Sequence, residues 1–175
     1  NDEDEFQFRQ LTQLYIHKGD ETFELAKPSQ GSVFSKAIVG RGAAYGDFDR
    51  DGDLDILITE NNGPVYLWRN DLIGNGNESN FIRVRLIGTV SNRDGLGSTV
   101  TVFSDQKATV QRVRTGSSYL SQSEKTLTFG LGKSEIIDSL KVNWANGSTD
   151  KFYDIKANQS LQITEGSKSL GYLKR

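Results

Sequence analysis

The stretch that decides the fold is Asp47-Phe48-Asp49-Arg50-Asp51-Gly52-Asp53-Leu54-Asp55. Aspartates occupy positions 1, 3, 5, 7 and 9 of this loop, and a glycine occupies position 6. Calcium takes six to eight oxygen ligands, which alternate carboxylates on a tight loop can supply. Glycine permits the positive φ of a sharp turn, and carboxylates this close repel one another unless a cation neutralises them. The pattern therefore predicts a calcium site rather than an acidic, solvated turn.

The residues around the loop predict strands rather than helices. A calcium loop of the EF-hand type needs a bidentate Glu at position 12 and a helix on each side, but position 12 here is Ile58. The run over residues 56–59 is β-branched and apolar, which is typical of a buried strand. We therefore expect a strand–loop–strand calcium site. Its expected ligands are the side chains of Asp47, Asp49, Asp51 and Asp55 and the backbone carbonyl of Asp53.

Composition limits the classes of function. The chain has 175 residues, of which 35% are hydrophobic and 25% charged, and its net charge is −2. No bulk attraction to nucleic acid or to an anionic membrane is expected from this balance, and no apolar run is long enough to cross a bilayer. Cysteine is absent, which excludes disulfides and zinc–thiolate sites. Methionine is absent too, so we expect a mature or excised fragment. A loop of this kind suits millimolar calcium, which predicts an extracellular, periplasmic or cell-surface location.

The first part of the chain, about residues 1–75, predicts short strands around the calcium loop. Residues 14–17 and 22–25 are expected to form a hairpin. Further strands are expected over residues 40–46, 55–60 and 65–69. No segment shows a convincing helical pattern.

A glycine- and asparagine-rich segment over residues 70–80 marks a boundary. In the first strand beyond it, apolar residues alternate with Arg83 and Arg85, a period of two. Short strands at regular spacing predict a β-sandwich or barrel. The expected strands cover residues 81–90, 98–104, 107–114, 126–131, 138–144, 149–154 and 159–164. The polar residues 167–175 are expected to form a loose tail.

The sequence contains only weak signals of a catalytic site. The only histidine, His17, lies at an expected strand end, so a surface histidine is favoured over a Ser-His-Asp triad. A glycosidase needs two carboxylates that flank a sugar bond. Asp94, Glu124 and Asp138 are candidates, although acidic loop residues of any β protein give the same pattern. We predict a protein that is not an enzyme. The alternative is an enzyme or enzyme-accessory domain that acts on carbohydrate or a secondary metabolite.

Basic residues form two pairs, Arg83 with Arg85 and Arg112 with Arg114, each spaced to share one face of a sheet. One interpretation is a basic patch for an acidic glycan or protein partner. The other, which we favour, is the solvated face of an antiparallel sheet.

Three polar loop residues, Arg93, Asp94 and Tyr119, are candidates for a ligand site. Their loops are rich in glycine and serine, and the alternative is a set of hydrogen-bonded turns that hold the strands in register. Trp68 and Trp144 lie on apolar strand faces and are expected in the core, whereas Tyr119 is the aromatic residue expected to be exposed.

Two parts of the chain resemble known families. Residues 40–55 resemble an FG-GAP/VCBS repeat of the integrin α-propeller type. Downstream, four stretches resemble the ASPIC/UnbV domain. These stretches are residues 91–97, 116–123, 129–132 and 137–144.

The resemblance implies a fold and a location but no activity. It implies that the five loop aspartates ligate calcium as described above. It implies a terminal blade of a β-propeller over residues 1–75, with the calcium loop at 47–55, followed by an antiparallel, β-sandwich-like ASPIC/UnbV domain over residues 78–166. Both would lie at the C-terminal end of a larger secreted or surface protein. Because a propeller needs four to eight blades, an alternative is that this blade packs on the following domain.

From these observations we predict an all-β, calcium-binding adhesion or binding module. Its partner would be a protein or a glycan, and we expect neither nucleic-acid binding nor membrane insertion. A further alternative is that the second domain merely covers the edge of the propeller, where unpaired strands would otherwise aggregate.

Overall fold

The computed structural model describes residues 8–27, 29, 31–72 and 79–173 of the chain. These residues form fifteen β-strands. Within the described ranges there is no α-helix, and the one helical turn is the 3-10 segment η1 (Val33–Ser35). The predicted all-β class is therefore confirmed. No helix of the described residues is long and apolar enough to cross a membrane. The predicted boundary between residues 75 and 78 lies outside the described ranges.

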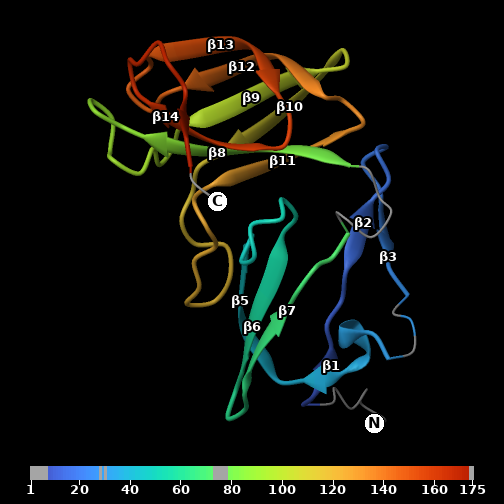
Figure 1. Ribbon diagram of the computed structural model, residues 1–175. Coiled ribbons are helices and arrows are strands. Elements are labelled where there is room, and N and C mark those ends of the chain that lie inside the picture. The colour runs from blue at the N-terminus through green and yellow to red at the C-terminus, as the bar shows by residue number, and fades with distance from the viewer. Residues whose placement is uncertain (1–7, 28, 30, 73–78, 174–175) are drawn as a thin grey trace.

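Seven strands form the N-terminal region, drawn from blue to green in the lower half of Figure 1. They are β1 (Gln10–Leu11), β2 (Tyr15–His17), β3 (Phe23–Leu25), β4 (Ala37–Ile38), β5 (Gly40–Gly46), β6 (Asp55–Glu60) and β7 (Val65–Trp68). They pair as β1–β4, β2–β3 and a three-stranded sheet in the order β5-β6-β7, all antiparallel. The pairing of β2 with β3 confirms the predicted hairpin, and His17 on β2 is exposed as expected.

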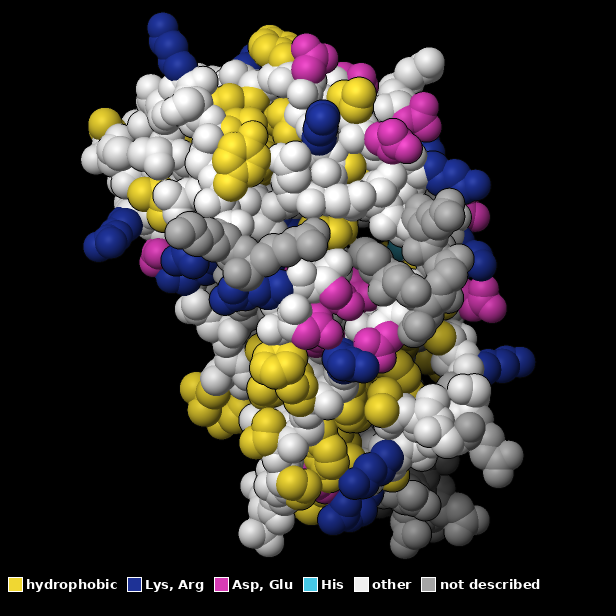
Figure 2. Space-filling view, in the orientation of Figure 1, with side chains coloured by type: hydrophobic (Ala, Val, Ile, Leu, Met, Phe, Trp, Pro, Cys, Tyr) yellow, Lys and Arg dark blue, Asp and Glu magenta, His cyan; other side chains and the backbone are white. Residues whose placement is uncertain are grey.

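The N-terminal region has a small core of its own. Ile38, Ile58 and Trp68 are buried together, and the rings of Phe34 and Trp68 form a T-shaped pair with centroids 5.2 Å apart. Much apolar surface remains exposed, as the yellow side chains in the lower half of Figure 2 show. The exposed apolar residues include Tyr15, Ile16, Phe23, Leu25, Leu57, Val65 and Leu67. This region therefore buries only part of its apolar side chains within the described structure.

Eight strands form what we call the two-sheet unit, in the upper half of Figure 1. They are β8 (Asn80–Ile87), β9 (Thr99–Ser104), β10 (Lys107–Arg112), β11 (Leu127–Gly132), β12 (Ile136–Asn143), β13 (Thr149–Lys156), β14 (Gln159–Thr164) and β15 (Gly171–Tyr172). One sheet has the order β10-β9-β12-β13 and the other β11-β8-β14-β15. The first seven lie within a few residues of the strands expected from the alternating pattern.

The main core lies between these two sheets. Alternation places every second residue of a strand on the inner face, and those positions carry apolar side chains of both sheets. The largest fully buried side chains there are Ile82, Val84, Leu86, Val100, Val113, Phe129, Ile137, Leu140, Val142, Leu161 and Ile163. Trp144 is buried as expected, and its indole N–H donates to Asp150 Oδ2 at 2.7 Å. A buried donor without a partner would be costly.

Two details differ from the sequence-based expectation. The pairing of β14 with β8 is parallel rather than antiparallel, because the chain leaves one sheet after β13 and enters the other through a short turn at Ala157 and Asn158. Asn158 has a φ of 60° and exchanges hydrogen bonds with the backbone of Phe81. The expected loose tail also contains β15, which pairs with β14.

A buried carboxylate holds one end of the two-sheet unit together. The Glu165 side chain accepts backbone N–H groups from Thr89, Val90 and Ser91 at 2.7–2.9 Å and the Asn146 amide at 2.7 Å. Burial by itself raises the pKa of Glu165, but the backbone hydrogen bonds outweigh it and lower the pKa to about 2. The charged form is thus favoured by folding, and it joins three separate loops.

Replacing Glu165 with Gln tests this contribution. The carboxylate has a folded pKa of about 2 against its usual 4.5, so its stabilising effect is present above the usual value and is lost as pH falls toward the folded one. We expect Glu165→Gln to melt at a lower temperature than the parent protein at pH 7. The difference in Tm between the two proteins should narrow as the pH falls from 4.5 to 2. An exposed control, Asp138→Asn on β12, should melt like the parent. A Tm difference that does not change with pH would contradict the stabilising role of the charged Glu165 carboxylate.

Candidate metal site and the junction around it

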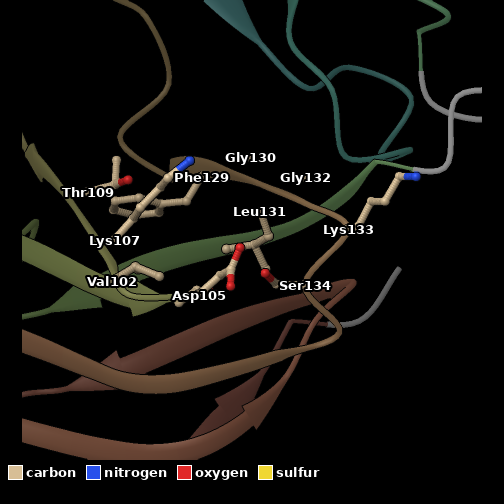
Figure 3. Close-up of a pocket in the computed structure, with 11 residues that line it drawn as sticks. Val102, Asp105, Lys107, Thr109, Phe129, Gly130, Leu131, Gly132, Lys133 and Ser134 are labelled. Atoms are coloured by element: carbon tan, nitrogen blue, oxygen red, sulfur yellow. The ribbon is translucent and has the colours of Figure 1, made fainter. Parts of the chain in front are cut away.

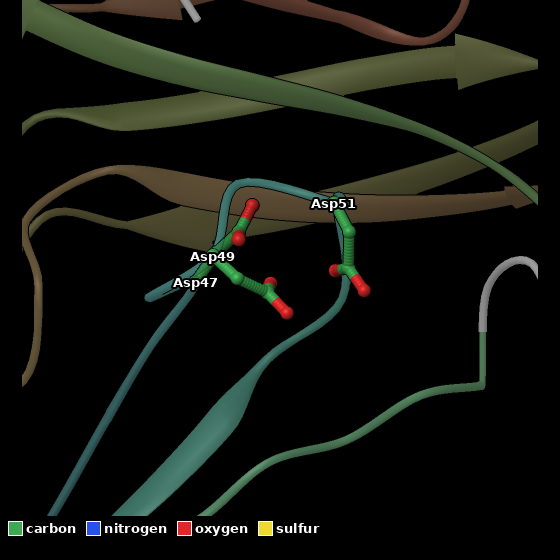
Figure 4. A group of neighbouring side chains, drawn as sticks. All are labelled: Asp47, Asp49 and Asp51. Atoms are coloured by element: carbon green, nitrogen blue, oxygen red, sulfur yellow. The ribbon is translucent and has the colours of Figure 1, made fainter.

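Three carboxylates of the loop between β5 and β6 lie close together (Figure 4). Asp47, Asp49 and Asp51 each place an oxygen within 4.8 Å of the others. Two oxygens that ligate the same calcium ion at 2.3–2.6 Å are at most about 5 Å apart. The spacing of the three carboxylates therefore fits one cation.

Asp47 gives an independent indication of a ligand. Its side chain is fully buried, and its Oδ1 atom has no hydrogen-bond partner, whereas Oδ2 accepts the Gly52 N–H at 3.1 Å. Burial raises the pKa of this carboxyl; Arg83 and the N–H groups of Arg50 and Gly52 oppose the rise, and Asp51 adds to it. A buried, incompletely paired carboxylate is costly, and a bound cation would remove that cost. Oxygen-only donors are those that calcium prefers.

The two remaining aspartates lie in the same loop but outside the group of three. Both oxygens of Asp55 accept backbone N–H groups, from Phe48 at 2.8 Å and from Asn70 at 2.9 Å. Asp55 therefore ties the loop to the segment after β7. Asp53 is buried, and its N–H donates to Asp51 Oδ1 at 3.0 Å. The predicted ligand roles of both residues stay predictions.

The metal loop meets the two-sheet unit at a buried ion pair. Arg83 on β8 is only 7% exposed. Its guanidinium lies 3.1 Å from Asp47 Oδ2 and 2.6 Å from Glu124 Oε2. The other oxygen of Glu124 accepts the Asp47 N–H at 3.2 Å. The expectation that Arg83 lies on a solvated face with Arg85 is wrong, because the metal loop covers that part of β8. Of these two arginines, only Arg85 is exposed.

A serine-rich loop between β10 and β11 covers the open edge of β5. This loop, gold in Figure 1, extends from the two-sheet unit beside β5. The backbone N–H of Ala43 donates to Ser118 Oγ at 3.0 Å, and that of Tyr45 donates to Ser123 Oγ at 3.1 Å. Glu124 N–H donates to the Tyr45 carbonyl at 3.0 Å. Edge groups that would otherwise be free for pairing with another strand are thus satisfied within the chain.

One comparison with a known family concerns the second half of the chain. Residues 88–170 match the family model described as ASPIC and UnbV. This stretch of the chain is ASPIC/UnbV-like. It includes Glu124 and the serine-rich loop, and it excludes β8 with Arg83.

The chain is also similar to cartilage acidic protein 1 of several vertebrates. It is 31% identical to the Xenopus tropicalis protein over 112 residues, which are 62% of this chain and 16% of that protein. It is 29% identical to the Homo sapiens protein over 133 residues, which are 74% of this chain and 19% of that protein. The mouse protein gives 29% over 133 residues. The aligned part of the chain spans at most a fifth of the length of these relatives.

The glycine-rich loop of the ASPIC/UnbV-like stretch forms hydrogen-bonded turns. Asn92 exchanges two hydrogen bonds with the backbone of Leu96, both at 2.8 Å. Gly95 has a φ of 66°, and a Cβ there would lie 2.6 Å from Leu86 Cβ. This geometry favours the interpretation in which the loop holds strands in register. Arg93 on the same loop is exposed.

The described part of the structure shows no polar contact that links Tyr119 to the other two candidate ligand residues, Arg93 and Asp94. Asp94 pairs with Lys125, and the hydrogen bond from Lys125 lowers the pKa of Asp94. Tyr119 is 66% exposed, as expected, and lies in the serine-rich loop on β5. Within the described ranges no hydrogen bond or ion pair links Tyr119 to Arg93 or Asp94. A common ligand site for the three residues stays a prediction.

Two hollows lie along the side of the two-sheet unit where β10 and β11 form the sheet edges. The larger, of about 660 Å³, has an apolar floor that includes Phe129 and Leu131 (Figure 3). Asp105 is the one carboxylate among its lining residues, and Lys133 points away from it. The second hollow, of about 460 Å³, lies at the junction and also has a single lining carboxylate, Glu124.

Sequence reasoning missed the residues of the junction, although one signal was present. Phe81 precedes Arg83 by two positions and therefore lies on the same face of β8. A large apolar residue on a face otherwise assigned to solvent indicates that something covers that face. In the structure Gly52 of the metal loop, with a φ of 106°, lies directly against the Phe81 ring.

Replacing Gly52 with Ala tests this close packing. A Cβ at residue 52 would overlap the Phe81 ring, and overpacking costs about 1–3 kcal/mol in addition to the cost of a positive φ. The matched control is Gly116→Ala, because Gly116 also has a positive φ (72°) but has nothing within 4 Å of an added Cβ. Urea unfolding should show a loss about 1–3 kcal/mol larger for Gly52→Ala than for the control. Equal losses would mean that the loop does not pack on β8.

Proposed function

We propose that this chain is a non-catalytic binding module whose metal loop holds a structural calcium ion. The observation that favours this proposal most is the buried Asp47 carboxylate, which has one unpartnered oxygen beside Asp49 and Asp51. A calcium ion there would neutralise part of the clustered charge and fix the connection between β5 and β6. Its role would be to stabilise the fold.

We further propose that the N-terminal region is the last blade of a β-propeller of the FG-GAP/VCBS type, and that the two-sheet unit is a β-sandwich-like domain. The exposed apolar residues on β6 and β7, such as Leu57, Val65 and Leu67, support a neighbouring blade, because propeller blades bury their faces against one another. The serine-rich loop on the edge of β5 supports the idea that the second domain closes that edge.

The chemistry of the surface supports a binding role over a catalytic one. A glycosidase places two carboxylates about 5–10 Å apart around its substrate. Each of the two hollows beside β10 and β11 has one lining carboxylate, and in the second hollow that group pairs with Arg83. The similarity to proteins named for cartilage supports an extracellular or cell-surface location, where calcium is abundant enough for a loop of moderate affinity.

Thermal melting with and without calcium tests the proposal. At a calcium concentration one hundred times its dissociation constant, binding should stabilise the folded state by about 2.7 kcal/mol. For a chain of this size that is a rise in Tm of roughly 5–10 °C. We expect this rise in millimolar calcium relative to excess chelator, and a smaller rise in magnesium, which demands a tighter octahedral site.

Asp49→Asn is the matched variant. The Asp49 side chain is partly exposed, and its ion pair with Arg69 is long, at 3.9 Å, so the substitution should leave the calcium-free protein almost unchanged. It should abolish most of the calcium-dependent rise, whereas Asp138→Asn should retain it. A parent protein that melts identically in calcium and chelator would refute the metal site.

A further inference from the structure

The second hollow, which we call the junction pocket, is formed by both parts of the chain. Tyr45 and Leu54 come from the N-terminal region, and Arg112 and Arg114 come from the end of β10 and the residues after it. The segment at residues 124–128 completes the lining. Its volume of about 460 Å³ is within the range of small-ligand sites, which often lie between domains.

The pocket has an excess of positive charge although the chain as a whole is slightly acidic. Its acidic group, Glu124, is occupied by Arg83, and Lys125 is occupied by Asp94. In the described structure the side chains of Arg112 and Arg114 form no ion pair or hydrogen bond. Two guanidinium groups are therefore available to a ligand. Figure 2 shows basic side chains on the visible face near the level of the junction.

The backbone holds the two arginines in a fixed relation. Val113 between them is 1% exposed and points into the core, so its neighbours on either side point outward. The Val113 N–H donates to the Ser98 carbonyl at 3.0 Å, and its carbonyl accepts the Gly97 N–H at 2.9 Å. Two guanidinium groups on the same side of one chain segment are suited to planar carboxylates, which arginine binds through two parallel hydrogen bonds.

The remaining lining residues indicate what the carboxylate belongs to. Gln111, Thr126 and Thr128 provide polar side chains, while Tyr45 and Leu54 provide an aromatic and an apolar surface. A ligand with many hydroxyl groups, an apolar ring face and a carboxylate matches this mixture. We propose that the junction pocket binds a carboxylated saccharide, with Arg112 and Arg114 as the carboxylate-binding residues.

This proposal rests on the proposed binding-module function and names its ligand. The saccharide would contact the pocket residues and not the calcium ion. The two proposals can fail separately. A calcium-dependent rise in Tm without saccharide binding would overturn only the pocket, and saccharide binding without a calcium effect would overturn only the metal site.

Calorimetric titration with a uronic-acid oligosaccharide tests the pocket. The parent protein should bind it, and the double variant Arg112→Gln/Arg114→Gln should bind it about tenfold more weakly or worse, because hydrogen bonds to charged groups are lost. The matched control is Lys151→Gln/Lys156→Gln, which removes the same charge from exposed positions on β13, the opposite edge of the same sheet. It should bind like the parent.

Two further ligands separate the alternatives. The same oligosaccharide with its carboxyl groups reduced should not bind, and a poly-glutamate peptide should bind more weakly than the saccharide. Equal weakening in both double variants, or equal binding of the reduced oligosaccharide, would overturn the proposal. Tighter binding of the peptide would overturn it in favour of an acidic protein partner. If the variants melt at the same temperature as the parent protein, a loss of binding is not due to a loss of folding.

Discussion

The buried guanidinium of Arg83 lies between two carboxylates from distant parts of the chain, Asp47 in the metal loop and Glu124 in the ASPIC/UnbV-like stretch. Removing one member of a buried ion pair leaves an uncompensated charge and typically costs several kcal/mol. The metal loop and the two-sheet unit are therefore held in one arrangement. The edge of β5, the packing of Gly52 on Phe81 and the junction pocket all depend on that arrangement.

Arg83 and a calcium ion would act on the same carboxylate without competing for the same atom. Arg83 and the Gly52 N–H occupy Oδ2 of Asp47, while Oδ1 has no partner. Arg83 offsets one negative charge in a cluster that also includes Asp49 and Asp51, and a divalent cation would offset two more. In this account calcium stabilises the junction as well as the loop, because Asp47 belongs to both.

The local residue pattern was enough to predict the strands, but it was not enough to predict how they pair or which of their faces are covered. The alternation of residues in β8 and the regular spacing of the short strands after it predicted the strands of the two-sheet unit within a few residues, since side-chain period is a local property. The parallel pairing of β8 with β14 depends on where the chain changes sheets, which no single segment encodes. The burial of Arg83 depends on residues far apart in sequence. The close approach of Asp47, Asp49 and Asp51 was predictable, because their spacing fixes it within one turn.

Amide hydrogen exchange with and without calcium tests the coupling between loop and two-sheet unit most directly. The informative amides are those of Tyr45, Asp47 and Glu124, which donate across the junction. We expect calcium to slow the exchange of all three amides, together with the amides of the loop itself. Slower exchange confined to the loop, with an unchanged rate at Glu124, would contradict it and would mean that the metal site and the second part of the chain are energetically separate.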